Sequence, residues 1–458
     1  MEDLEKTYQN AIDLMASGHR AQARHLFAQF LLQAPDHPIA NANMGVLLCE
    51  QRLYDAAIIH MRKSLINDPE NLESQSNLFN ALLRCRRYAE AKTEMERALW
   101  ISSAPNDQNE TRIFADLWTN KGLFEYETGD LENSERSYRY SIKLHEENGS
   151  NCDIARNNLP YPVLAQGRLK EGFELHEARW ISLQKHPIWS TATPRWNGES
   201  CKRLFVHFEQ GLGDTLHFSR FLDKLTDRYP DTAVTFAVQP PLIRFMQENF
   251  PRVHVIGPDE VPLCDYYIPL MSLPNALGLY RIEDYQWSGF KAQPPQAGAP
   301  YLGNCPLLKV GLVWAGNPGQ EADVHRSMPF KHLMALADPR VILFSLQVGD
   351  RSKDIARAGA EGFVFDLSPW MTDFSASASL VKQLDLVVTV CTGALHLCAG
   401  LNVPTLGLVP YVRCWRWLRD REDSPSYPSL RLIDQDTPYN WAGQVEKARA
   451  IIQEKLNG

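Results

Sequence analysis

The stretch 204–215, which reads LFVHFEQGLGDT, decides the fold of the larger part of the chain. Its first five residues form a short apolar run rich in β-forming side chains, and two glycines follow directly before a helical run. Paired glycines permit a tight turn from strand to helix and a close approach by a ligand. The stretch therefore predicts the first strand and helix of an α/β region, with a ligand site at the turn.

Asp214 stands in this turn, where the expected helix begins. A carboxylate at this position can accept a proton from a substrate hydroxyl, or it can simply cap the helix. The first N–H groups of the helix form a natural site for an anion. The motif is not the dinucleotide fingerprint, because Leu216 occupies the third glycine position.

Further short apolar runs alternate with helical segments on both sides of a Pro-, Gln- and Ala-rich linker at 291–300. They lie at 233–238 and 253–256 before the linker, and at 310–314, 341–344, 363–365, 386–390 and 405–409 after it. This alternation predicts βαβ units with parallel sheets. Two such halves suggest a cleft between them, with ligands at the carboxyl ends of the strands. A last helix at about 440–456 packs on one half or the other.

The N-terminal part repeats with a period of 34 residues. Ala23, Ala57 and Ala91 keep this spacing, as do Leu31, Leu65 and Leu99. Each unit reads as two amphipathic helices, in which a small residue allows close helix packing. The pattern resembles the tetratricopeptide repeat. The register slips at the turn-rich loop 102–109, and a fourth unit around Gly122 and a degenerate fifth at 152–185 follow. Stacked helix pairs expose a concave face that binds a partner or only supports the rest of the chain.

Composition places the chain among ordinary globular proteins. It has 458 residues, 44% apolar and 22% charged, with a net charge of −8. This charge argues against a chain-wide nucleic-acid or anionic-membrane binder. No apolar stretch is long enough to span a bilayer, and the acidic start lacks the basic region of a secretory signal. Nine cysteines without a scaffold pattern favour a reducing cytosol, so we expect a cytoplasmic protein without an integral membrane segment.

Loops after two strand-like runs of the second half carry polar candidates. The loop 314–318, WAGNP, can admit a ligand, and Arg326 can pair with phosphate oxygens or lie on the surface. In the segment 391–396, CTGALH, Thr392 and the helix N-terminus can hold a diphosphate. His396 can reach a phosphate or be a core histidine. Cys391, His396 and Cys398 read as small residues on a helix rather than as metal ligands.

Two late segments read less specifically. Arg416 stands between two tryptophans at 415–417, where it can face a ligand or pack and form an ion pair. The segment 434–436, DQD, resembles a metal-binding motif but reads as a loop.

Together these motifs resemble the tetratricopeptide-repeat glycosyltransferases with a GT-B catalytic region, similar to the heptosyltransferases of glycosyltransferase family 9 and more distantly to the O-GlcNAc transferases. The matching pieces, in order, are RW at 179–180, WNG at 196–198, EQGLGD at 209–214, WAGN at 314–317, RS at 326–327, SLQ at 345–347, TGALH at 392–396, WRW at 415–417 and SYPS at 426–429.

The resemblance implies a repeat domain at 1–185 and a GT-B fold of two Rossmann-like halves, at 201–290 for the acceptor and 306–458 for the nucleotide-sugar, joined by a linker at 291–305. It implies an inverting sugar transfer without a metal or other cofactor, in which Asp214 is the general base. The acceptor-side loop is Glu209, Gln210, Gly211 and Gly213. The donor-binding residues are Arg326, Gln347, Thr392, Gly393, His396 and Arg416.

Two positions depart from the family pattern. Cys391 stands where the family usually has Asp, and Ala376 stands at a second frequent Asp. These departures favour an alternative, a repeat scaffold whose catalytic region has lost activity. The favoured hypothesis is transfer of a hexose, a heptose or a sialic-acid-like nonulose to a protein, flagellin-like proteins included, recruited on the concave repeat face. A third hypothesis is transfer to lipid-linked or polysaccharide acceptors.

Overall fold

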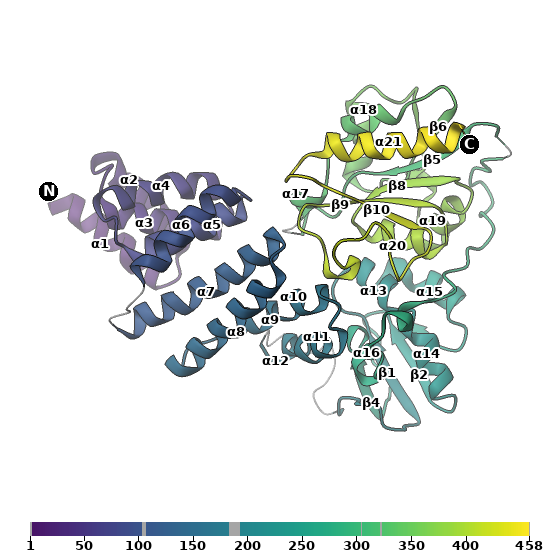
Figure 1. The fold of residues 1–458 in the computed structure, drawn as a ribbon, viewed down its shortest axis with the longest axis horizontal. Helices are drawn as coiled ribbons and strands as arrows, with labels where there is room; N and C mark the ends of the chain where they lie inside the picture. The colour runs from purple at the N-terminus through teal and green to yellow at the C-terminus, as the bar shows by residue number, and fades with distance from the viewer. Residues whose placement is uncertain (1, 103–106, 183–192, 304, 321–322, 458) are drawn as a thin grey trace. The chain divides into compact units, whose positions relative to one another are not determined.

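The computed structural model describes residues 2–102, 107–182, 193–303, 305–320 and 323–457 (Figure 1). The chain forms two compact units, Met1–Pro162 and Val163–Gly458. The boundary falls inside the segment 152–185 that the sequence predicts as a degenerate fifth repeat. Residue 185, the predicted end of the repeat domain, and residues 103–106 of the predicted loop lie outside the described residues.

The first unit is built from consecutive helix pairs joined by short turns (Figure 1). Its helices are α1 (Glu2–Ala16), α2 (Arg20–Gln33), α3 (Pro38–Glu50), α4 (Tyr54–Asn67), α5 (Leu72–Arg84), α6 (Tyr88–Ile101), α7 (Gln108–Thr128), α8 (Leu131–Asn148) and α9 (Asp153–Asn158). The next helix, α10 (Pro160–Ala165), spans the boundary between the units.

Small residues set the close packing of these pairs, as the sequence predicts. The repeat alanines Ala23, Ala57 and Ala91 are fully buried. At Gly45 of α3, a Cβ atom would lie 2.7 Å from Cγ of Met61 on α4. At Gly122 of α7, it would lie 2.9 Å from the ring of Tyr138 on α8. The fourth pair, α7 and α8, therefore keeps the helix contact of the earlier pairs after the register slips.

Two parallel sheets form the framework of the second unit, which confirms the predicted α/β class. The first sheet has the order β3-β2-β1-β4 and contains β1 (Arg203–His207), β2 (Ala233–Ala237), β3 (His254–Ile256) and β4 (Tyr266–Pro269). The second has the order β10-β9-β8-β5-β6-β7 and contains β5 (Leu308–Val313), β6 (Val341–Ser345), β7 (Val364–Asp366), β8 (Leu386–Val390), β9 (Thr405–Val409) and β10 (Leu430–Asp434).

Each sheet reverses its strand order once. In the first sheet β1 lies between β2 and β4, and in the second β5 lies between β6 and β8. The carboxyl ends of strands beside such a reversal are where open α/β sheets bind ligands. The loops that leave β1, β5 and β8 are therefore the places to look for a site.

Helices and turns connect the strands. Those up to the second sheet are α11 (Leu169–His176), α12 (Ala178–Ser182), α13 (Leu212–Phe218), α14 (Phe221–Arg228), η1 (Pro240–Leu242), α15 (Ile243–Asn249), η2 (Leu270–Ser272), α16 (Leu273–Ala276) and η3 (Ile282–Tyr285). The later ones are α17 (Asp323–Arg326), η4 (Phe330–Leu336), η5 (Asp350–Lys353), α18 (Asp354–Arg357), η6 (Ser368–Trp370), α19 (Phe374–Val381), α20 (Gly393–Gly400), η7 (Trp415–Trp417) and α21 (Trp441–Asn457).

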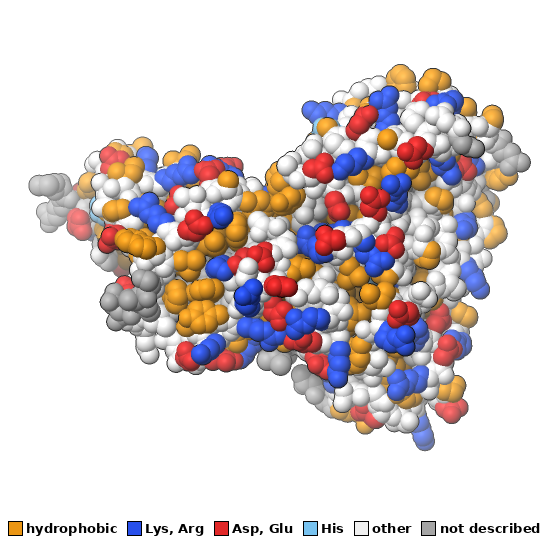
Figure 2. All heavy atoms as spheres, in the orientation of Figure 1, with side chains coloured by type: hydrophobic (Ala, Val, Ile, Leu, Met, Phe, Trp, Pro, Cys, Tyr) orange, Lys and Arg blue, Asp and Glu red, His pale blue; other side chains and the backbone are white. Residues whose placement is uncertain are grey.

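The terminal helix α21 packs on the second sheet (Figure 1). Its buried residues Trp441, Val445, Ala448 and Ile452 share one core with Leu312 of β5. Elsewhere on the molecule, Figure 2 shows positive and negative side chains interspersed over one face of the described residues, in keeping with the modest net charge of −8. No helix of the described ranges is both long and apolar enough to cross a membrane.

Candidate functional site

The glycine-rich turn predicted from the sequence leaves the carboxyl end of β1. Gln210 has a φ of 60°, in the left-handed region, and this turns the chain sharply into α13. Asp214, in the first turn of α13, accepts a hydrogen bond from the backbone N–H of Gly211 at 3.1 Å. Asp214 thus performs the capping role that the sequence left open.

Asp214 also has a partner from the opposite half of the unit. Its Oδ1 atom accepts a hydrogen bond from Nη2 of Arg416 at 2.5 Å. The guanidinium is held in place by Trp415, whose ring centroid lies 4.8 Å away, and by Phe218 at 5.5 Å. The Asp214 side chain is 22% exposed and that of Arg416 is 10% exposed. Solvent therefore reaches the pair.

A second helix N-terminus meets the first at this point. At Gly213 of α13, a Cβ atom would lie 3.0 Å from Cδ2 of His396 and 3.3 Å from Cα of Gly393. Gly393 begins α20, which follows β8. Because neither position has a side chain, the two helix starts lie against each other, and the structure brings Asp214 together with the predicted donor loop.

Thr392 is the N-cap of α20, but its side chain makes no capping bond. Its Oγ1 atom is buried and has no hydrogen-bond partner in the structure. The first N–H groups of a helix also lack intrahelical acceptors. This corner therefore offers an unused hydroxyl and helix N–H groups, a donor set that suits an anion.

His396 lies in the interior between the two halves. It is 7% exposed, and its Nδ1 atom lies 2.9 Å from the hydroxyl of Tyr427. The ring stacks on Trp417, with centroids 5.2 Å apart. Burial, with the charges of Arg416 and Arg220, lowers its pKa well below the usual value. The sequence left two alternatives for His396, a phosphate contact and a core histidine. Its burial matches the core histidine, and a contact with phosphate stays a prediction.

Arg326 lies against the loop that follows β5, where a Cβ atom at Gly316 would lie 3.0 Å from its Nη2. Its Nε atom pairs with Asp323 at 3.1 Å, and its Nη2 donates to Gln320. Burial raises the pKa of the Cys391 thiol to about 11, while the charges of Arg326 and Arg416 oppose that rise. Cys391, which stands where the glycosyltransferases that the sequence resembles usually have Asp, therefore lies near enough to both arginines for their charges to act on it.

Glu209 and Gln347 are engaged in hydrogen-bond networks of their own. Glu209 accepts two hydrogen bonds from Arg179, both at 2.8 Å, and one from the Met271 N–H at 2.9 Å. The Gln347 amide bonds the backbone of Trp314 and Ala315. Both buried side chains thus hold strand ends in place. Their predicted ligand contacts stay predictions.

The sequence analysis missed Arg220, which joins the two halves behind the site. This guanidinium is fully buried and donates to the backbone carbonyls of His217, Tyr285 and Ser426. It also lies 4.5 Å from the ring centroid of Tyr427. The available signal was the spacing of positions 213, 217 and 220, because residues three or four apart share a helix face. Arg220 itself lies just beyond the end of α13.

The assembled site has a carboxylate, an arginine beside it and two helix N-termini. Such a group can take a proton from a hydroxyl at Asp214 and hold an anionic leaving group at α20 and Arg416. The described ranges contain no cluster of three or more His, Cys, Asp or Glu side chains placed to hold a metal ion.

Comparison with known proteins supports the repeat assignment. Residues 8–71 match a family model for the tetratricopeptide repeat, so the N-terminal helix pairs include repeats of this type. The chain is 24% identical over 493 residues to Protein FlbA of Caulobacter vibrioides, covering 92% of this chain and 80% of that protein.

Two solved structures are similar to part of this chain. One is TTC0263, a thermophilic tetratricopeptide-repeat protein of Thermus thermophilus, with 20% identity, coverage of 40% of this chain and 93% of that one, and a TM-score of 0.30. Another is PilW, a type IV pilus biogenesis factor, with 18% identity, coverage of 41% and 81%, and a TM-score of 0.35.

Proposed function

We propose that this chain is a GT-B glycosyltransferase that moves a sugar from a nucleotide-sugar to a hydroxyl of a protein recruited by the repeats. One observation carries the proposal. Asp214, Arg416 and the N-terminus of α20 lie together, partly exposed to solvent, between the two parallel sheets. The sequence resemblance supplies the reaction class, and these residues supply the groups that the reaction needs.

The chemistry assigns one task to each side of the site. On the acceptor side, Asp214 takes the proton of the acceptor hydroxyl as its oxygen forms a bond to the anomeric carbon. The bond from that carbon to the diphosphate oxygen breaks, and its electron pair leaves with the nucleoside diphosphate. On the donor side, the N–H groups of α20, the Thr392 hydroxyl and an arginine stabilise the charge on the departing diphosphate.

Arg416 has two roles in this scheme. Without ligand it neutralises Asp214 through the 2.5 Å contact. A bound diphosphate carries more negative charge than a single carboxylate, and it competes for the same guanidinium. Donor binding then draws Arg416 toward the leaving group and releases the carboxylate for the acceptor hydroxyl.

The repeat unit fits the recruitment of a protein acceptor. Stacked helix pairs of this type present an extended surface that binds peptides or proteins, and residues 8–71 match the repeat family. A protein acceptor is therefore preferred over a lipid-linked or polysaccharide one.

A binding and transfer experiment tests the proposal. The purified full-length chain is titrated by calorimetry with UDP-, GDP-, ADP-, dTDP- and CMP-sugars. The donor that binds is then incubated with candidate acceptor proteins and read by intact mass. The proposal expects saturable binding of one donor class and a mass increase of one sugar residue. Absence of binding across the whole panel contradicts it.

A scaffold without catalytic activity is the second candidate, favoured by specific contacts. Asp214 is already bound by Arg416 and by the Gly211 N–H, and Cys391 replaces a family carboxylate with a thiol that carries no negative charge at neutral pH. The scaffold hypothesis predicts that the repeats bind a protein partner and that the chain binds no nucleotide-sugar. The calorimetric panel therefore separates the two candidates.

A further inference from the structure

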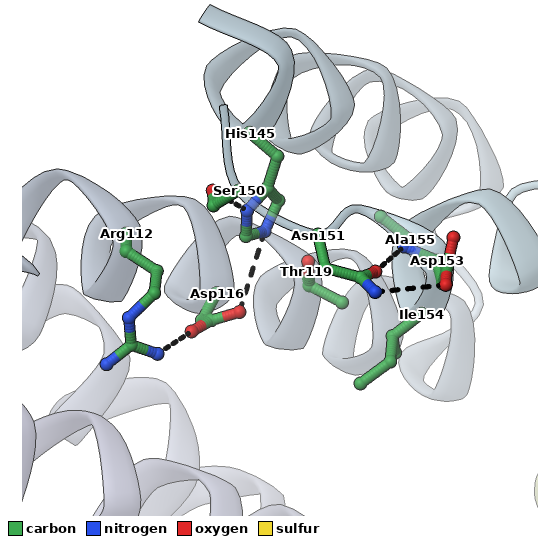
Figure 3. A pocket seen from close by; sticks show the side chains of 9 residues that line it. All are labelled: Arg112, Asp116, Thr119, His145, Ser150, Asn151, Asp153, Ile154 and Ala155. Carbon is green, nitrogen blue, oxygen red and sulfur yellow. Dashed lines mark hydrogen bonds and ion pairs between the residues drawn. The ribbon is translucent and has the colours of Figure 1, made fainter. Parts of the chain in front are cut away.

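The first unit contains a pocket of about 310 Å³ that the transfer chemistry does not use (Figure 3). It lies between α7, the end of α8 and the start of α9, so all of its walls belong to one unit. Its lining residues are Arg112, Asp116, Thr119, His145, Ser150, Asn151, Asp153, Ile154 and Ala155.

The lining is rich in oxygen atoms and acidic in balance. Two carboxylates, Asp116 and Asp153, stand against one cationic side chain, Arg112, in this lining. Thr119 and Ser150 add hydroxyl oxygens, which already bond Ser141 and His145. The remaining ionisable group of the lining is His145. Burial lowers the pKa of its imidazole, so this ring is neutral at pH 7. The balance of two carboxylates against one guanidinium favours a positively charged ligand.

The two oxygens of Asp116 are held unequally, and one has only a long contact. Its Oδ2 atom receives Arg112 at 3.0 Å, whereas its Oδ1 atom lies 3.5 Å from Nε2 of His145, which is longer than an ordinary hydrogen bond. Burial raises the pKa of the Asp116 carboxyl, while the charges of His145 and Arg112 oppose that rise. A cationic donor at Oδ1 would add a second strong partner for the carboxylate.

The existing ion pair is easily rearranged. Arg112 and Asp116 are 47% and 44% exposed and stand four residues apart on α7, and exposed pairs of this kind are weak. Arg112 also donates to Oδ1 of Asn109 at 3.1 Å, so it keeps a partner if it leaves the carboxylate.

The rim offers an apolar wall beside these oxygens. Ile154 is 69% exposed, and Ala155 is buried next to it. Figure 3 shows Ile154 and the Asn151–Asp153 pair on one side of the pocket and Asp116 with His145 on the other. A long side chain can lay its methylene groups along Ile154 and direct its charged end to Asp116.

We propose that this pocket binds a lysine side chain of the protein partner. The Oδ1 atom of Asp116, held only by the long contact with His145, suits a compact ammonium, whereas the planar fork of arginine matches a carboxylate best through both oxygens. The inference rests on the recruitment part of the proposed function and is independent of the transfer step.

Peptide binding to the full-length chain, without any nucleotide-sugar, tests the proposal. The probes are fluorescent pentapeptides, blocked at both ends, with a central Lys, Arg, norleucine or acetyl-lysine. Affinity for the Lys peptide is expected to exceed that for the two neutral peptides about tenfold or more, as for a charged hydrogen bond, and to exceed that for the Arg peptide. Equal binding of the Lys and norleucine peptides overturns the proposal.

Two substitutions with opposite effects sharpen the test. Asp116→Asn should weaken binding of the Lys peptide about tenfold or more, while Arg112→Gln removes the competing cation and should strengthen it about two- to fivefold. Glu147→Gln is the matched control, since it removes an exposed acid of α8 that pairs with Lys143 outside the pocket, and it should leave binding unchanged. If Arg112→Gln and Asp116→Asn both weaken binding, the pair is only structural and the proposal fails. Because no donor is present, a failure of sugar transfer leaves these results unaffected.

Discussion

Replacing Thr392 with Val should stabilise the chain and weaken nucleotide-sugar binding. The Thr392 Oγ1 atom is buried without a hydrogen-bond partner, and the side chain makes no capping bond. An unsatisfied buried hydroxyl costs roughly 1–3 kcal/mol, and Val fills nearly the same volume without the polar group. We expect a gain of about 1 kcal/mol or more, or about 2–4 °C in Tm for each kcal/mol.

The same substitution should have the opposite effect on the donor. If the hydroxyl binds the diphosphate, its loss removes a hydrogen bond to a charged group, worth about 1.5–3 kcal/mol. The affinity measured by calorimetry should then fall about 10- to 100-fold.

Thr389→Val in β8 is the matched control. The Thr389 hydroxyl is buried too, but it donates to the carbonyl of Val390 at 3.0 Å. Its loss should destabilise the chain by about 0.5–1.5 kcal/mol and leave donor affinity unchanged. A Thr392→Val chain that loses stability, or that binds the donor as well as the natural chain, would refute the reasoning.

Three further predictions concern packing, the buried ion pair and pH. Gly213→Ala should cost about 1–3 kcal/mol, because its Cβ would lie 3.0 Å from His396, while Gly211→Ala meets only contacts of 3.5 Å and should cost less in chemical denaturation. Glu209→Gln should destabilise by about 1–3 kcal/mol, because buried Arg179 loses one of its two carboxylates and keeps only the longer contact with Glu177, at 3.3 Å; a loss below about 0.5 kcal/mol would contradict this. Burial lowers the pKa values of His217 and His396 in the folded chain, so the unfolded state binds more protons below about pH 6.5. Unfolding free energy should therefore fall between pH 7.5 and 5.5, by at most about 1.4 kcal/mol for each histidine, and His396→Gln should show a smaller fall; an unchanged pH slope would count against the buried neutral form.

The repeats and most strands follow directly from local sequence. A 34-residue period puts alanines at the contacts between helices, and fully buried strands such as 386–390 appear as runs that are apolar at nearly every position. The strand at 266–269 was not predicted, because it has only four residues, begins with two tyrosines and ends at a proline. Such a short run carries no usable periodicity.

The components of the site were predictable, but their pairing was not. The glycine turn and the donor loop each follow a strand, so local patterns locate them. The contact of Asp214 with Arg416 joins residues 202 positions apart, and it depends on how the two sheets are brought together. Likewise, the ion pair of Glu209 with Arg179 depends on a helix that lies thirty residues earlier in the chain.

The most direct test of the account is the rate of sugar transfer by the Asp214→Asn chain. Asp284→Asn is the matched control, since Asp284 accepts the same kind of bond from the Arg281 N–H at 2.9 Å but lies outside the site. A general base contributes about 10²–10⁴-fold, so Asp214→Asn should slow transfer by that factor. Donor affinity should not fall, because Arg416 loses its competing carboxylate, while Asp284→Asn transfers normally. Equal rates for the Asp214→Asn and natural chains would contradict the central claim that this carboxylate activates the acceptor.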